Sequence, residues 1–152
     1  MKVGDLVEDF ELPDQDGKPR TLSGLLADGP VVLFFYPAAM TGGCTMESCH
    51  FRDLAAEFAE VGAQRVGISA DTVEKQRQFS DINSFDYPLL SDVDKKVANQ
   101  FGVARKLIPM IAVKRHTFVI GTDRRVIAVI KSELKMNVHA DEALKALRAH
   151  VA

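Results

Sequence analysis

The sequence contains no apolar run approaching 18 residues, no run of more than two lysines or arginines, and only two cysteines. A membrane-spanning helix needs about 20 apolar residues, so we expect no membrane contact. The formal net charge of -2 and the lack of a basic run argue against nucleic-acid binding. The first ten residues carry acids and no apolar core, which argues against a secretory signal and favours a cytoplasmic protein.

The small number of cysteines also narrows the function classes. Two cysteines in a reducing compartment rarely serve as a structural disulfide, and more often form a redox or metal-binding pair. The chain does not need a disulfide for stability, because 152 residues with 47% apolar content can bury an adequate core. We expect residues 1–152 to form one domain.

Hydrophobic periodicity predicts strands and helices that alternate along most of the chain. Residues 31–36 form a continuous apolar run, typical of a strand covered on both faces. The turn signal at residues 13–17 predicts a small N-terminal hairpin. This order predicts an α/β fold with a central mixed sheet flanked by helices. After the hairpin, the expected strands are 31–36, 65–70, 87–90, 117–120 and 126–130, and the expected helices are 44–61, 73–84, 94–101 and 140–151.

Cys44 is the residue that the sequence most clearly marks as reactive. It follows a glycine-containing loop and falls in the first turn of a predicted helix. Unpaired N–H groups and the positive end of the helix dipole favour an anion there, so a thiol ionises more easily. Phe51 lies seven residues later in nearly the same direction, so Cys44 continues the buried stripe of the helix. We expect Cys44 to be a reactive thiolate inside a formed pocket.

Cys49 lies five residues after Cys44, rotated by roughly 140° and risen by roughly 7.5 Å on an ideal helix. The two Cα atoms would then be about 8.7 Å apart, beyond the roughly 7 Å limit for a disulfide. The two cysteines therefore cannot bond until the first helical turns unwind. The alternative is that Cys49 is only an exposed thiol, because its direction groups it with Asp53 and Glu60.

A thiolate near a second cysteine suits oxidation to a sulfenic acid followed by disulfide closure. The oxidant would be a peroxide, whose O–O bond needs a nucleophile and hydrogen-bond donors. The candidate donors are the Thr41 hydroxyl, the backbone N–H groups of residues 43–44 and a nearby cation. Glu47, one turn beyond Cys44, opposes thiolate formation, so a compensating arginine is needed, with Arg52 and Arg115 as candidates.

The pattern Pro37-x-x-x-Thr41-x-x-Cys44 resembles the active-site motif of the peroxiredoxins. The longer string over residues 35–53, with its second cysteine five residues after the first, is similar to the peroxiredoxin Q group, also called bacterioferritin comigratory protein. The similarity extends over most of the chain. It implies a thioredoxin-like fold with an N-terminal β-hairpin extension and a thiol peroxidase that reduces hydrogen peroxide and organic hydroperoxides.

The resemblance implies that Cys44 is the peroxidatic cysteine and Cys49 the resolving cysteine. Thioredoxin or a similar dithiol protein would reduce the resulting disulfide. No metal or organic cofactor is implied. The group is often monomeric, and a weak homodimer formed through edge contacts is the alternative.

The resemblance also assigns the neighbouring residues. Thr41 would hydrogen-bond the thiolate and the peroxide, and Pro37 would shield and shape the pocket. Arg115 matches the family's pocket arginine, and Glu47 matches a glutamate characteristic of the group. One departure stands out: the family usually reads Thr-Pro-Gly-Cys, whereas Gly42 stands in place of the proline. The loop is therefore expected to be less preorganised.

Other functions fit the sequence less well. A metal cluster of Cys44, Cys49 and His50 lacks a usual zinc spacing. A disulfide oxidoreductase of the thioredoxin type requires two residues between its cysteines, whereas four intervene here. A non-catalytic thioredoxin-fold redox sensor or interaction module is the alternative from another class.

Two further features are less specific. The histidines at positions 116, 139 and 150 are expected at the surface or at a sheet edge. The apolar stretch at residues 107–113 is either core filler or a collar beside the pocket that binds organic hydroperoxides or docks the reductant.

Overall fold

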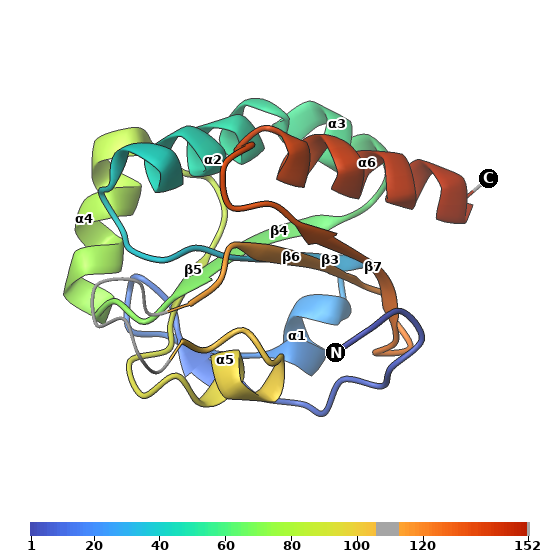
Figure 1. Ribbon diagram of the computed structural model, residues 1–152, viewed down its shortest axis with the longest axis horizontal. Coiled ribbons are helices and arrows are strands. Elements are labelled where there is room, and N and C mark those ends of the chain that lie inside the picture. The colour runs from blue at the N-terminus through green and yellow to red at the C-terminus, as the bar shows by residue number, and fades with distance from the viewer. Residues whose placement is uncertain (106–112, 152) are drawn as a thin grey trace.

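The computed structural model describes residues 1–105 and 113–151. Its element order confirms the predicted alternation after an N-terminal hairpin (Figure 1). No helix in this part of the chain is long and apolar enough to cross a membrane. The strands are β1 (Glu11–Pro13), β2 (Pro19–Thr21), β3 (Val31–Phe35), β4 (Gln64–Ser69), β5 (Leu89–Ser91), β6 (His116–Ile120) and β7 (Val126–Lys131). The helices are α1 (Leu22–Leu26), α2 (Gly42–Asp53), α3 (Ala55–Glu60), α4 (Val73–Asn83), α5 (Lys96–Gln100) and α6 (Val138–Val151).

Five strands form the main sheet, in the order β5-β4-β3-β6-β7. Strands β3, β4 and β5 are parallel, whereas β6 and β7 run antiparallel to their neighbours. The predicted central mixed sheet is therefore confirmed. Because β3 lies in the middle, the loop that leaves its carboxyl end enters the centre of the molecule, where α2 begins.

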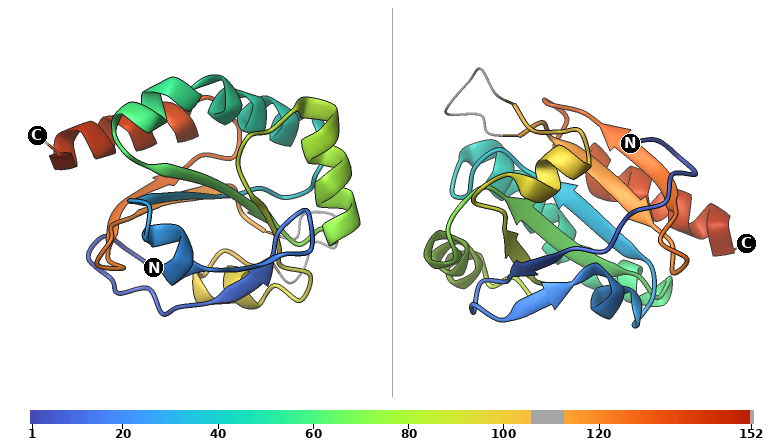
Figure 2. Two further views of the ribbon diagram at one scale, coloured as in Figure 1. Left: turned by 180° about the vertical axis from the view of Figure 1, so that it is seen from behind. Right: turned by 90° about the horizontal axis from the view of Figure 1, so that it is seen from below.

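The sheet is covered on both faces (Figures 1 and 2). Helices α2, α3 and α6 lie on one face, with α4 beside β5. The N-terminal segment, α1 and α5 lie on the other face. This arrangement confirms the thioredoxin-like layering that the sequence predicts, with the separate β1–β2 hairpin as the N-terminal extension.

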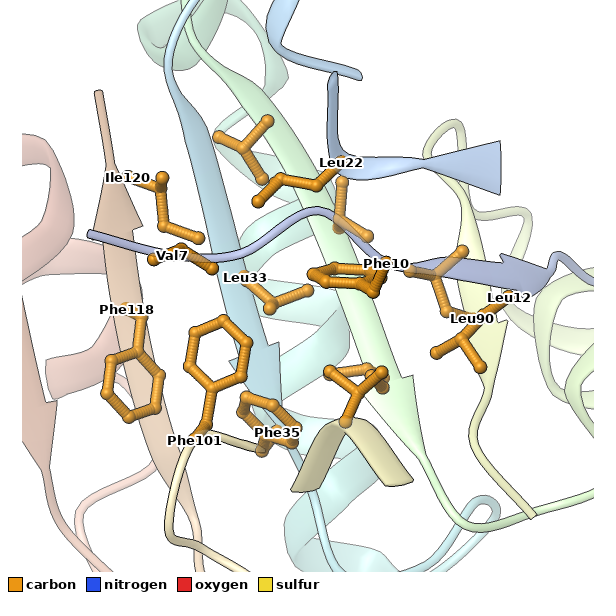
Figure 3. Packing of buried hydrophobic residues seen from close by; sticks show 14 of the residues in the cluster. Val7, Phe10, Leu12, Leu22, Leu33, Phe35, Leu90, Phe101, Phe118 and Ile120 are labelled. Atoms are coloured by element: carbon orange, nitrogen blue, oxygen red, sulfur yellow. The ribbon is translucent and has the colours of Figure 1, made fainter. Parts of the chain in front are cut away.

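The central strand explains why both faces are needed. Every residue of β3 is buried, and alternate side chains point to opposite sides of the sheet. Leu33 and Phe35 enter the cluster under the N-terminal segment and α5, where Phe10, Phe101 and Phe118 meet them (Figure 3). Val32 and Phe34 enter the cluster under α2, α3 and α6. The uninterrupted apolar run is thus accounted for by two cores.

The single helix predicted over residues 44–61 is wrong, because this segment forms two helices. The structure breaks it at Leu54, between α2 and α3. Arg65 of β4 lies against the break, and its guanidinium donates hydrogen bonds to the carbonyl oxygens of Phe51 (3.0 Å) and Arg52 (3.5 Å). These carbonyls lie at the end of α2, where intrahelical donors run out. Arg65 also pairs with Asp86, which fixes it in place.

The outcomes of three smaller predictions differ. The hairpin turn is confirmed, and Asp14 closes it by accepting hydrogen bonds from the backbone N–H groups of Asp16 and Lys18. The five-residue helix α1 was not predicted from the sequence, because it is short and contains Gly24. The apolar stretch at residues 107–113 falls almost entirely outside the described residues.

Candidate active site

The candidate site lies where the carboxyl end of β3 passes through residues 36–41 into α2. The predicted position of Cys44 in the first helical turn is confirmed, although α2 begins two residues earlier, at Gly42. The Cys44 side chain is fully buried and unbonded to other cysteines. Hydrogen bonding within the helix starts with the Thr45 N–H, so the N–H groups of Gly43 and Cys44 have no intrahelical acceptor.

Arg115 is the cation that faces Cys44. Its Nη2 donates to the Cys44 sulfur at 3.4 Å, and its Nη1 donates to Glu47 Oε1 at 2.8 Å. Burial works against the charged guanidinium, but the Glu47 carboxylate and the Cys44 sulfur outweigh it and raise the pKa of Arg115. Of the two arginines proposed from the sequence, Arg115 therefore fills the role. Arg52 instead donates to the Asn83 carbonyl at 2.6 Å, away from Cys44.

Glu47 is fully buried one turn beyond Cys44. Burial raises its pKa from 4.5 to about 8, although Arg115 acts in the opposite direction. Its Oε1 accepts the Arg115 hydrogen bond, whereas its Oε2 has no hydrogen-bond partner within the described structure. His139 also lies near this oxygen, with its Nδ1 3.6 Å from Oε2. The predicted juxtaposition of Cys44, Glu47 and Arg115 is thus present.

His139 corrects an expectation from the sequence, because it is fully buried and does not lie at the surface or at a sheet edge. Its Nδ1 lies 2.8 Å from Thr117 Oγ1, and its Nε2 lies 2.7 Å from the Ser132 carbonyl. Burial lowers the pKa of His139. Helical spacing contained the signal, because His139 is four residues before the buried Ala143. Extending the predicted apolar stripe one residue towards the N-terminus would have found it.

Of the two other histidines, one is placed as the sequence predicts and one is not. His150 is exposed, as predicted. His116 is half-buried on β6, which lies between β3 and β7 and is not an edge strand. Burial lowers its pKa to about 4.

Thr41 departs from the role that the resemblance implies. Its hydroxyl donates to the Ala38 carbonyl at 2.8 Å and makes no hydrogen bond to Cys44 in this structure. Thr41 occupies the N-cap position of α2, but its side chain caps no backbone N–H. The contact with the thiolate therefore requires a rotation of the side chain.

A hollow of about 470 Å³ lies against Arg115 and the first turn of α2. Pro37, Thr41 and Gly43 line it. The Cys44 sulfur has no exposed surface and lies behind Arg115. Gly43 permits this arrangement, because a Cβ atom there would lie 2.9 Å from Met136 Cε and 3.3 Å from Arg115 Nη2.

Glu133 and Arg105 complete the wall of the hollow, and neither was proposed from the sequence. A Glu133 carboxylate oxygen accepts the backbone N–H of Arg115 at 2.7 Å, and the other pairs with Arg105. Glu133 thereby fixes the start of β6, from which the Arg115 side chain reaches Cys44. No sequence spacing links these residues, because they meet only through the fold.

Cys49 is half-buried and packs against the core, so the idea that it is merely an exposed thiol is wrong. Its sulfur lies 3.6 Å from Asn83 Oδ1 and faces α4. Both cysteines lie on α2 and both are free, as helical geometry requires. The described residues contain no group of three His, Cys, Asp or Glu side chains placed to hold a metal ion.

Comparison with known proteins agrees with this geometry. The AhpC/TSA family model matches residues 3–129. The crystal structure of peroxidoxin BcpB from Mycobacterium tuberculosis is 67% identical, with a TM-score of 0.95, and the match covers 98% of this chain and 97% of that chain. Peroxiredoxin Bcp from Escherichia coli is 36% identical over 154 residues, covering 99% of this chain and 97% of the relative.

A solved structure of the Xanthomonas campestris bacterioferritin comigratory protein, described for its alkyl peroxide reduction activity, is 31% identical with a TM-score of 0.88 over the full length of both chains. The fold that places the buried Cys44 thiol beside Arg115 is thus shared with a protein described for alkyl peroxide reduction. The chain belongs to the AhpC/TSA family and is a thiol peroxidase, a peroxiredoxin of the Bcp and peroxiredoxin Q group.

Proposed function

We propose that Cys44 is the peroxidatic residue and that its thiolate attacks one oxygen of a hydroperoxide. The S–O bond forms as the O–O bond breaks, and the electron pair leaves on the other oxygen, which takes up a proton to give water or an alcohol. Cys44 becomes a sulfenic acid. The observation that carries the assignment is the Arg115 guanidinium, which contacts both the Cys44 sulfur and Glu47.

Peroxide reaches the sulfur through the hollow beside Arg115. Because the sulfur is covered, Arg115 moves towards the incoming oxygen and keeps donating to it as negative charge develops there. The N–H groups of Gly43 and Cys44 are the fixed donors at the helix start. Rotation of the Thr41 hydroxyl away from Ala38 adds a fourth donor. Catalytic hydrogen bonds often tighten only when substrate is present.

We propose Cys49 as the resolving residue. Its thiol attacks the Cys44 sulfenic acid, the S–S bond forms, and water leaves. The two cysteines are five residues apart on one helix, so the first turns of α2 unwind before this step. A dithiol reductant, thioredoxin or a similar protein, then reduces the disulfide by thiol exchange.

The substrate range includes hydrogen peroxide and organic hydroperoxides. Leu134 and Met136 line the hollow, and Leu134 is 88% exposed. These apolar side chains suit the alkyl group of an organic hydroperoxide. The alkyl peroxide reduction described for the Xanthomonas campestris relative supports the same range.

We place this activity in one domain, residues 1–152, because both cores of the single main sheet draw on distant segments of the chain. We also place it in the cytoplasm, where thiol reductants keep two such cysteines reduced. A monomer or weak homodimer suffices, since one chain supplies Cys44, Cys49 and Arg115.

Intact-mass analysis tests the cycle. One equivalent of hydrogen peroxide should remove two hydrogens from the reduced protein, and reduced thioredoxin should restore the starting mass. The gain of a single oxygen that persists would exclude Cys49 as the resolving residue. An unchanged mass would exclude Cys44 as a peroxidatic thiol.

A further inference from the structure

A line of buried polar groups continues behind the active site. It runs from the Cys44 sulfur through Arg115 to Glu47, and from the free oxygen of Glu47 to His139. All four side chains are at most 6% exposed. The proposed peroxide chemistry uses Cys44 and Arg115 directly, but it gives His139 no role.

The charges along this line do not balance without a proton. Arg115 supplies one positive charge, whereas an ionised Cys44 and an ionised Glu47 would supply two negative charges. Glu133, which holds the Arg115 backbone, adds further negative potential and its own partner is Arg105. An uncompensated buried charge is costly, so one proton must reside on Cys44, Glu47 or His139.

The hydrogen bonds of His139 fix where a proton fits. Its Nε2 faces the Ser132 carbonyl, which only accepts, so Nε2 carries a hydrogen. Its Nδ1 then presents a lone pair or a second proton towards Thr117 Oγ1 at 2.8 Å and Glu47 Oε2 at 3.6 Å. Oε2 is the oxygen of Glu47 that has no hydrogen-bond partner within the described structure.

We propose that one proton is held between Glu47 Oε2 and His139 Nδ1, so that the positive charge of Arg115 is left to the Cys44 thiolate. His139 is thus a positioning residue, which acts on Cys44 through Glu47. The inference rests on the proposed role of Cys44. Glu47 Oε2 and His139 Nδ1 lie 3.6 Å apart in a buried site, close enough for the protonation of one residue to affect the other.

The opposite pKa shifts of the two partners are consistent with this arrangement. Burial raises the pKa of Glu47 and lowers that of His139, so both the protonated carboxyl and the neutral imidazole are favoured. The charged or titratable groups that face the pair are Cys44, Arg115 and Glu133, with His116 on the neighbouring strand.

The test is the pH titration of the Cys44 thiolate, followed by its ultraviolet absorbance in a Cys49→Ser background, where Cys44 is the sole thiol. His139→Leu removes the acceptor, so the proton returns to the sulfur. We expect the titration midpoint to rise by about 1 pH unit, a roughly tenfold loss of thiolate. His139→Gln offers an amide oxygen in place of Nδ1 and should restore part of the shift.

Glu47→Gln provides the matched control, because it removes the carboxyl that would hold the proton. When His139→Leu is added to the Glu47→Gln variant, the midpoint should not change further. An equal rise in both backgrounds would mean that His139 acts only through packing, and no rise in either would also overturn the proposal. If the midpoint shifts as expected but peroxide is not consumed, the proposed function fails while this inference stands.

Thr117→Val covers the case in which His139→Leu does not fold. Valine has nearly the same shape as threonine but removes the hydroxyl that competes for Nδ1. His139 then has Glu47 as its remaining partner on that side, so the midpoint should stay the same or fall. A rise in the Thr117→Val midpoint would contradict a proton held by Glu47 and His139.

Discussion

The two halves of α2 are held in place by different means. Residues 42–47 carry Cys44 and depend on polar contacts from Arg115, with no side-chain cap at the helix start. Residues 48–53 carry Cys49 and are fixed from several sides. Tyr87 donates to the Ser48 carbonyl at 2.7 Å, and Phe51 stacks on Phe34 with ring centroids 4.1 Å apart. We therefore expect the first half to be the part that unwinds, while the second half keeps Cys49 in place.

The largest expected effect separates the two cysteines. Cys44→Ser should abolish peroxide consumption, because serine has no comparable nucleophile. Cys49→Ser should still consume one equivalent and leave a sulfenic acid that dimedone traps. Stopped-flow peroxide assays and intact-mass analysis measure both. Peroxide consumption that is lost in Cys49→Ser but kept in Cys44→Ser would reverse the assigned roles.

Arg115→Lys should weaken the first half of α2 and the reaction together. Lysine keeps the charge but lacks the planar group that donates to Cys44 and Glu47 at once. Removal of one such donor costs about 100- to 1000-fold in rate for comparable sites. The second-order rate constant with hydrogen peroxide measures the loss. Arg52→Lys, in the second half of α2, is the control, and a similar loss there would contradict the comparison between the two halves.

Tyr87→Phe should loosen the second half. The change removes one hydrogen bond to the Ser48 carbonyl and keeps the ring, so stability should fall by about 0.5–1.5 kcal/mol. Disulfide formation should also change, because Cys49 is then less firmly placed. The chain has no tryptophan, so quenched-flow samples analysed by mass are the suitable measurement. An unchanged free energy of unfolding would show that Tyr87 does not hold this half.

The protonation of Glu47, in the first half of α2, makes the stability of the protein depend on pH. The pKa of Glu47 is about 8 in the folded protein against an ordinary 4.5, so the folded state binds this proton more tightly. Its stabilising contribution is complete below the ordinary value and is lost as pH rises through about 8. We expect the free energy of unfolding to fall by about 2–3 kcal/mol from about pH 6 to 9, and Glu47→Gln to flatten this change. Urea denaturation across this range measures it.

Gly42→Pro should have the smallest effect. Thr41 already has the extended backbone that precedes a proline, at φ -83 and ψ 155, and a Cβ at position 42 would meet nothing within 4 Å. Proline at the first helical position needs no N–H donor. We expect a gain of about 0.4–1 kcal/mol and disulfide formation slowed by a few-fold. Faster closure would mean that the first half does not unwind.

Much of this architecture follows from the sequence because the signals are local. The apolar run at β3 and the glycine-rich approach to Cys44 predict the strand, the helix start and the burial of the thiol. The pairing of Arg115 with Cys44 and Glu47 was reached through the family resemblance. These features depend on neighbours along the chain or on a complete motif.

The remainder depends on contacts between distant segments. At the break at Leu54, Arg65 arrives from the next strand and bonds a carbonyl oxygen at the end of α2. Glu133, just after β7, meets Arg115, just before the neighbouring strand β6. These contacts have no signal within one segment, whereas the burial of His139 could have been found from its helical spacing to Ala143.

The missing side chain at Gly43 has a last consequence. The guanidinium that steadies the sulfur lies within 3.3 Å of the position that one additional carbon atom would take. A Gly43→Ala chain would retain both cysteines, the arginine and the carboxylate, but the end of Met136 would have to move and the guanidinium would have to give way slightly. The close approach of this cation to the first turn of α2 therefore depends on the absence of a methyl group at position 43.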